Sequence, residues 1–208
     1  MASLFAKPKS ISIACAAVLV LACGDDRSIK WTEDVLLPDG RTVVLTRYQE
    51  FRGPSEIGQP PSDSYYWFEF KHPDTSENVR WETKVEPGTV ALMIHERTPL
   101  LLTRPRFGSG LRDFNCPNPP YLLYRHVAAG KWERIDLDQI PVKRLRANMT
   151  FGASSSIKQI KELNHHLNVG ITAQSMYQFK PWIMDFANVK QTFHSTNCDK
   201  PRDDLLTK

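Results

Sequence analysis

The chain repeats one pattern four times: two short segments rich in aromatic and β-branched residues, separated by a few residues that favour a tight turn. Aromatic and branched side chains are enriched in β-strands, and Gly, Pro and Asn between two such segments favour a reversal of the chain. In the first turn, Pro38 presets one backbone angle and Gly40 accepts a left-handed one. The four expected hairpins pair residues 31–37 with 42–51, 65–71 with 79–84, 89–95 with 100–104, and 121–127 with 132–138.

Eight short strands at this spacing predict a mainly β domain: an antiparallel meander, a sandwich or a partly open barrel. A propeller is a minor alternative, because the strand pairs recur at similar intervals although their sequences do not repeat. The linkers at 53–63 and 107–120 are rich in Gly, Pro and Ser, and we expect them to be ordered surface loops. Residues 176–186 are ambiguous, and one interpretation is a further strand interrupted by Pro181.

One C-terminal helix is expected over residues 156–168, packed on the sheet. Ser156 and Gln159 match a capping box at its start, and Gly170 can end it. The apolar stripe that defines the helix consists of Ile157, Ile160, Leu163 and Leu167, at helical spacing.

The N-terminus resembles a bacterial lipoprotein signal. Lys7 and Lys9 precede an apolar run over 11–22, and Cys23 follows the small residue that ends this run. A transmembrane helix would need about 20 apolar residues, so the run is too short to span a bilayer. A buried core helix and an ordinary signal cleaved after Ala22 are the alternatives. The expected division is a signal peptide at 1–22, a lipidated cysteine with a short tether at 23–30, and a single β-rich domain at 31–208.

The number of cysteines supports lipidation of Cys23. Cys15 leaves with the signal peptide, so lipidation leaves Cys116 and Cys198 as an even pair, whereas a free Cys23 would leave three thiols in an exported protein. We therefore expect a disulfide between Cys116 and Cys198, with two separately buried thiols as the alternative. The expected location is the cell envelope, membrane-anchored and facing the periplasm. Gly24, in place of aspartate after the cysteine, slightly favours the outer membrane.

Composition and motifs argue against several classes of protein. The formal net charge is +4, and it falls to +2 when Lys7 and Lys9 leave with the signal peptide, so no nucleic-acid partner is expected. No cofactor or metal is expected either, because the sequence has no phosphate-binding glycine loop and no paired Cys-x-x-Cys motif. His95 and Glu96 begin like a zinc-protease helix, but Pro99 stands where the second histidine would be needed.

A proline-rich motif carries a resemblance to a known group. Cys116, Pro117, Asn118, Pro119, Pro120 and Tyr121 are followed by an aromatic strand and by the stretch Gly130, Lys131, Trp132, Glu133, Arg134 and Ile135. Over residues 31–141 the chain resembles a group of uncharacterised proteobacterial exported proteins and lipoproteins. The resemblance implies export. It transfers no catalytic residue, because the group has no assigned activity.

The aromatic residues around the second hairpin are the candidate binding surface: Tyr65, Tyr66, Trp67 and Trp81. Because side chains alternate along a strand, Tyr66, Phe68 and Phe70 are expected on one face and Tyr65 and Trp67 on the other. An exposed aromatic face could bind an envelope protein or a cell-wall glycan, whereas a covered one would be core.

Two classes of function follow. The first is a non-enzymatic envelope lipoprotein that binds a partner or has a structural role. The alternative is an envelope hydrolase whose site is assembled from dispersed residues such as His126, Asp136 or His166.

Overall fold

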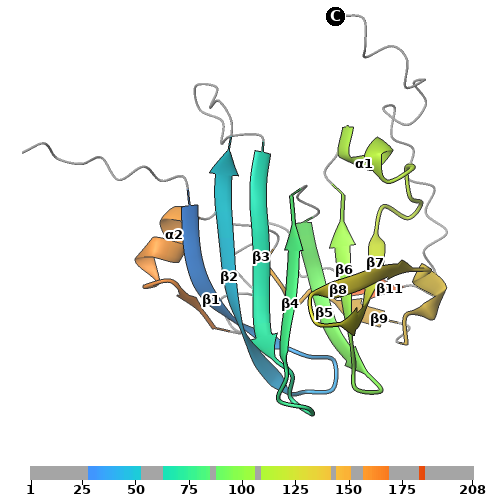
Figure 1. Cartoon of the computed structure of the whole chain (residues 1–208), viewed down its shortest axis with the longest axis horizontal. Helices are drawn as coiled ribbons and strands as arrows, with labels where there is room; N and C mark the ends of the chain where they lie inside the picture. The colour runs from blue at the N-terminus through green and yellow to red at the C-terminus, as the bar shows by residue number, and fades with distance from the viewer. Residues whose placement is uncertain are drawn as a thin grey trace, which may run out of the picture.

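The computed structural model describes residues 28–52, 63–84, 88–105, 109–141, 144–150, 157–168 and 183–185. Within these ranges no helix has both the length and the apolar character needed to cross a membrane. The four expected hairpins are all present, and they form two antiparallel sheets (Figure 1). The prediction of a mainly β domain is therefore confirmed.

The five-stranded sheet contains the first two hairpins and has the order β10-β1-β2-β3-β4. Strands β1 to β4 are antiparallel neighbours, and β10 adds a short parallel pairing to β1. The strands are β1 (Ser28–Leu36), β2 (Thr42–Arg52), β3 (Asp63–Lys71), β4 (Asn78–Thr83) and β10 (His166–Leu167).

The four-stranded sheet contains the other two hairpins, in the order β5-β6-β7-β8. A separate two-stranded pair joins β9 to β11. The strands are β5 (Gly88–His95), β6 (Thr98–Arg104), β7 (Leu122–Ala128), β8 (Lys131–Ile135), β9 (Arg144–Arg146) and β11 (Ile183–Asp185), and a 3-10 helix, η1 (Leu137–Gln139), follows β8.

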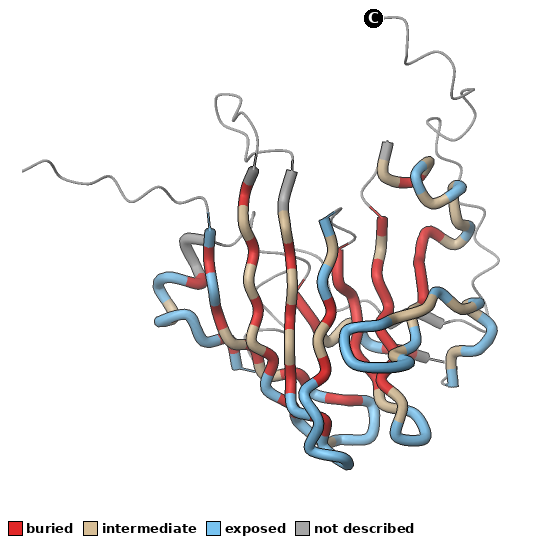
Figure 2. Tube along the Cα trace, in the orientation of Figure 1, coloured by how far each residue is buried: buried red, intermediate tan, exposed pale blue. Residues whose placement is uncertain are grey.

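The main core lies between the two sheets. Buried and less buried residues alternate along β1 to β3, as Figure 2 shows by the change between red and tan. The buried face of this sheet packs against Leu92 and Leu101 of the four-stranded sheet, which makes a sandwich. Its core side chains include Trp31, Val35, Leu45, Phe68 and Phe70.

Strands β5 and β6 of the four-stranded sheet are buried on both faces. Val90, Met93, Leu100 and Leu123 form a second apolar cluster with Leu145 of β9 on the side away from the main core. Strands covered on both faces need apolar residues at successive positions rather than alternation. This explains the unbroken apolar run at Leu100, Leu101 and Leu102.

Two expectations about the bounds of strands and loops were wrong. Strand β1 begins at Ser28 rather than at residue 31, because Ile29 is buried in line with Trp31 and continues the alternation. Helix α1 (Ser109–Asp113) interrupts the linker that was expected to be a loop. Leu111 is buried there, and its carbonyl accepts a hydrogen bond from the Cys116 N–H at 2.7 Å.

The C-terminal helix is present but shorter than expected. Helix α2 (Ile157–Glu162) ends before Asn164 and His165, which both have positive φ angles and therefore leave the helical path. Ile160 is fully buried in the main core, as the apolar stripe predicted. Leu167 is buried too, but it lies in β10 and not in the helix.

Side chains join the two sheets at their open edges. On one side, Asn148 donates from Nδ2 to the Leu36 carbonyl of β1 at 2.8 Å and to the Leu92 carbonyl of β5 at 2.9 Å, and its Oδ1 accepts from the Leu92 N–H. On the other, Trp132 of β8 donates from its indole N–H to the Arg80 carbonyl of β4 at 2.7 Å. These side chains satisfy backbone groups of Leu36, Leu92 and Arg80 without a further strand.

A third link connects two hairpin turns. His72 is buried at the end of β3, and its Nδ1 accepts the backbone N–H of Asp74 at 3.1 Å. Its other nitrogen, Nε2, therefore carries the proton and donates to the Arg97 carbonyl in the β5–β6 turn at 3.0 Å.

We expect Asn148→Ala to lower the free energy of unfolding by about 2–4 kcal/mol, because it leaves backbone groups of Leu92 without partners. Urea denaturation measures this. Asn78→Ala, at the exposed start of β4, is the matched control and should change little. Equal effects of the two substitutions would contradict the bridging role of Asn148.

Candidate functional site

The outer face of the five-stranded sheet presents a cluster of aromatic and basic side chains. These residues point away from the main core, since their strand neighbours are the buried ones. Tyr48, Tyr65 and Trp67 are half-buried, and Lys30 is exposed. We call this cluster the outer aromatic surface and define it as Lys30, Tyr48, Tyr65, Trp67 and Arg80.

Trp67 is the centre of this surface. The Tyr48 ring from β2 stacks on it with centroids 5.6 Å apart and an interplanar angle of 16°. The Arg80 guanidinium, from β4 on the other side of β3, lies 4.4 Å from the Trp67 ring centroid, and the Lys30 ammonium lies 5.6 Å from it. Both contacts are of the cation–π kind. Because β2 and β4 flank β3, the indole is held from both sides.

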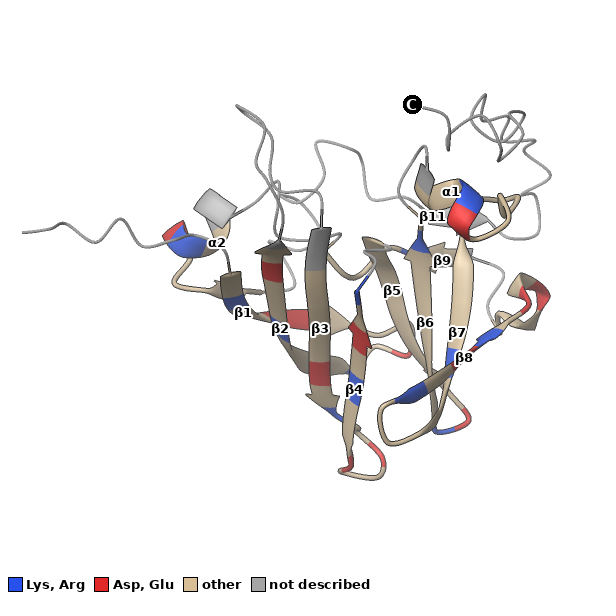
Figure 3. Cartoon of the chain, turned by 45° about the horizontal axis from the view of Figure 1, so that its top comes forward, with Lys and Arg blue, Asp and Glu red and all other residues tan. Residues whose placement is uncertain are grey.

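Two carboxylates are tied into the same surface. Glu69 of β3 pairs with Arg80 at 3.5 Å. Glu82 accepts a hydrogen bond from the Tyr65 hydroxyl at 3.0 Å and pairs with Arg80 at 3.2 Å. These two contacts lower the pKa of Glu82, with the Tyr65 hydrogen bond as the larger cause. Figure 3 shows acidic and basic positions interspersed along β1 to β4, so this sheet does not present a face of a single charge.

This geometry limits what the surface can bind. A sugar stacks on the face of an aromatic ring, but Tyr48 and Arg80 already approach the Trp67 ring from both sides. A ligand would therefore meet the edges of the aromatic rings rather than the faces of Trp67. Trp, Tyr and Arg are the residues most enriched at binding hot spots. The arrangement suits a broad contact better than a glycan-stacking site.

The structure divides the four aromatic residues predicted from the sequence. Tyr65 and Trp67 lie on the outer face, as the alternation predicted. Tyr66 and Trp81 do not belong to the surface: they are only 2% and 7% exposed and lie in the main core. Trp81 packs there against Tyr124 and Trp132, with centroids 4.7 and 5.5 Å away.

The sequence reasoning missed Lys30, Tyr48 and Arg80. Their signal lies in the hairpin register, which pairs Tyr48 with Lys30 on one side and with Trp67 on the other. Arg80 is one outward position away from Glu82, the partner of Trp67. Counting residues back from each turn would have placed these side chains on one face.

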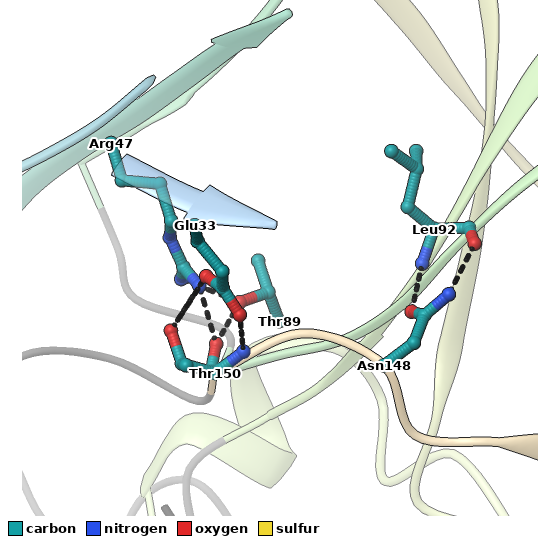
Figure 4. Close-up of polar contacts among 6 residues, drawn as sticks. All are labelled: Glu33, Arg47, Thr89, Leu92, Asn148 and Thr150. Carbon is teal, nitrogen blue, oxygen red and sulfur yellow. Dashed lines mark hydrogen bonds and ion pairs between the residues drawn. The ribbon is translucent and has the colours of Figure 1, made fainter. Parts of the chain in front are cut away.

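A second notable cluster is buried between the sheets (Figure 4). Glu33 of β1 and Arg47 of β2 form an ion pair with no solvent exposure. Glu33 also accepts from the Thr150 N–H at 2.6 Å and from its hydroxyl at 2.9 Å. Arg47 donates to the Thr89 hydroxyl of β5 at 2.8 Å and to the Thr150 carbonyl at 2.9 Å. No sequence signal predicts this cluster, because Thr150 lies 117 positions from Glu33.

The opposite charges of Glu33 and Arg47 stabilise each other inside the buried cluster. Burial is the largest single effect on the pKa of Arg47 and lowers it, but the effects of Glu33 and Tyr66 together outweigh burial, so the pKa is raised. The guanidinium also lies 5.0 Å from the Trp31 centroid and 5.2 Å from that of Tyr66. Burial raises the pKa of the Tyr66 phenol. With Glu33, Arg47, Thr89 and Thr150 all inaccessible to solvent, we assign the cluster a structural role.

The residues of the hydrolase alternative have separate surroundings. His126 of β7 packs edge-on against Trp132, with centroids 5.1 Å apart, while Asp136 follows β8 and is exposed. His166 of β10 makes a 2.8 Å hydrogen bond to the Thr32 hydroxyl through Nδ1, and its Nε2 lies 3.5 Å from Asp34. The contacts that hold His126 and His166 thus involve different partners.

The predicted lipidation site and one cysteine of the predicted disulfide lie outside the described residues. Cys23 and Cys198 lie there, as do the signal peptide and residues 186–208. Cys116 follows α1 and is disulfide-bonded. Its pairing with Cys198 stays a prediction.

Within the described ranges, no group of three or more His, Cys, Asp or Glu side chains is placed to hold a metal ion. Comparison with protein-family models, with curated proteins and with solved structures finds no match to this chain.

We expect Arg47→Met to destabilise the fold by about 3–5 kcal/mol, because it leaves the Glu33 carboxylate buried without its cation. Combining it with Glu33→Leu should recover part of this loss, since no uncompensated charge then remains. Urea denaturation checks both variants. Arg41→Met, which removes an exposed pairing with Asp39 and Asp74, is the control and should change stability little. Similar losses at positions 41 and 47 would rule out the central role of the buried pair.

Stability should decrease on acidification through His126. Burial lowers the pKa of His126 in the folded protein below its ordinary value near 6.5. The unfolded chain therefore takes up the proton first as the pH falls below about 6.5, and folding loses free energy down to the lower, folded-state pKa. His126→Gln should reduce this acid-side slope in urea midpoints measured from about pH 7.5 to about pH 5. Val127→Gln, at the neighbouring exposed position, should keep it.

Proposed function

We propose that this chain is a bacterial envelope lipoprotein, anchored through Cys23, that acts by binding and not by catalysis. The observation that carries the proposal is the outer aromatic surface, a built cluster on the outward side of the sheet. The signal-like N-terminus supports the anchor, and strand β1 begins only five positions after Cys23. An envelope location facing the periplasm is part of the same proposal.

The second candidate, an envelope hydrolase, draws on Thr32, His166 and Asp34. The Thr32 hydroxyl contacts the His166 imidazole, which in turn contacts the Asp34 carboxylate. This series of contacts has the order of a nucleophile, a base and an orienting group. However, the Thr32 hydroxyl is also 3.4 Å from the His165 carbonyl, and the Thr32 N–H already donates to that carbonyl at 2.8 Å. The backbone N–H of Thr32 itself is thus not free to stabilise an oxyanion. This favours binding.

The anchor is tested by changing the cysteine. We expect Cys23→Ala to release the protein from the membrane fraction or to block its processing, because the acyl chains would be lost. Intact-mass measurement of the wild type should show a lipid-modified Cys23 as first residue. A wild-type mass with an unmodified Cys23 or a retained Met1 would contradict the proposal.

The binding surface is tested by photo-crosslinking in living cells. A photoreactive phenylalanine at position 65 samples the outer aromatic surface, and the same residue at position 127 samples an exposed site on β7. We expect adducts from position 65 and few from position 127. Equal adducts at both positions, or robust hydrolysis of peptidoglycan or esters that is lost in His166→Gln, would speak against a binding role.

A further inference from the structure

The outer aromatic surface lies at one end of its sheet. Lys30, Tyr48 and Trp67 form one cross-strand row, and Tyr65 lies in the next row toward the start of β1. The far end of the same face carries Leu36. In Figure 1 this start of β1 is at the upper end of the sheet. The aromatic rings are thus gathered where the chain enters the domain.

The distance to the expected anchor is short. Four residues separate Cys23 from Ser28, the first residue of β1, and they span at most about 14 Å when fully extended. Lys30 is two residues into β1, about 7 Å along the strand. The Lys30 ammonium is in turn 5.6 Å from the Trp67 ring centroid. A bilayer that holds Cys23 is therefore within reach of the whole surface.

The chemistry of the surface matches the lipid headgroup layer. Tyrosine and tryptophan prefer the membrane–water interface, because an apolar ring and a polar tip are both accommodated there. Lys30 and Arg80 place cations beside the rings, where lipid phosphates can accept hydrogen bonds. Glu82 and Glu69 both pair with Arg80, at 3.2 and 3.5 Å, and Glu82 also accepts from the Tyr65 hydroxyl, so neither carboxylate stands as an isolated negative charge.

We infer that the outer aromatic surface rests on the headgroup layer of the bilayer that anchors the chain, and so sets the orientation of the domain on the membrane. This inference rests on the proposed anchoring at Cys23. It names the bilayer as the component bound by Lys30, Tyr48, Tyr65, Trp67 and Arg80.

The test uses the full-length lipidated protein in vesicles of phosphatidylethanolamine and phosphatidylglycerol, some of them with bromines near the carbonyl end of the acyl chains. Bromine quenches a tryptophan that lies at the membrane interface. We expect a quenched component in the wild type that is lost in Trp67→Phe and kept in Trp132→Phe. Trp132 lies at the seam with β4 and serves as the matched control.

A second measurement needs no substitution. Lys71 is exposed on the same outer face, four residues beyond Trp67 and so about 13 Å farther along β3. Amine labelling followed by mass spectrometry should decrease several-fold at Lys30, relative to Lys71, when protein in detergent is moved into vesicles.

The outcomes separate the two proposals. Protein that is not lipidated and does not join the vesicles overturns the proposed function and this inference with it. Anchored protein without a Trp67 component, or with equal labelling of Lys30 and Lys71, overturns this inference alone. Protection of Lys30 from amine labelling in cells, but not in vesicles that contain this protein alone, would also overturn the inference, in favour of a protein partner.

Discussion

The buried ion pair of Glu33 and Arg47 is the interaction on which the packing of the two sheets depends. Two charges without solvent exposure are stable only if their remaining hydrogen-bonding capacity is met inside the protein. Thr89 from β5 and Thr150 from the segment after β9 meet much of it, and the Arg47 Nε has no hydrogen-bond partner among the described residues. Both threonines come from outside the five-stranded sheet, so the pair fixes where the other sheet and a distant segment must lie. An apolar core of the same size would not specify that position so narrowly, because hydrophobic contacts have no direction.

Both faces of the five-stranded sheet have an arginine packed against aromatic rings, but the inner arginine is enclosed and the outer one is not. Inside, Arg47 lies between the rings of Trp31 and Tyr66, and a carboxylate completes the closed set. Outside, Arg80 lies beside Trp67, but the ring edges and the Lys30 ammonium remain toward the solvent side. The inner contact therefore holds the fold, and the outer one leaves chemistry available for a ligand. Strand alternation alone separates the two roles.

The four hairpins were predictable from sequence because each is local: its turn residues and its apolar alternation lie within about 20 positions of one another. The separation of Tyr65 and Trp67 from Tyr66 was predictable for the same reason. Trp81 was misplaced because its burial depends on Tyr124 and Trp132, which come from another hairpin. The helix was overextended because helical spacing continues through Leu163 and Leu167, whereas pairing of β10 with β1 decides the backbone there. Contacts such as Glu33 to Thr150 leave no local trace in the sequence.

Strand β1 couples the anchor, the core and the surface. It begins five positions after Cys23, directs Lys30 outward beside Trp67, and directs Glu33 inward to Arg47. Because side chains alternate with a period of two, a shift of one residue against β2 would bury Lys30 and expose Glu33. The buried ion pair thus maintains the register that presents the outer cluster. A substitution in the core is therefore expected to disturb the outer aromatic surface even though the substituted residue does not contact it, since both depend on the alignment of strand β1.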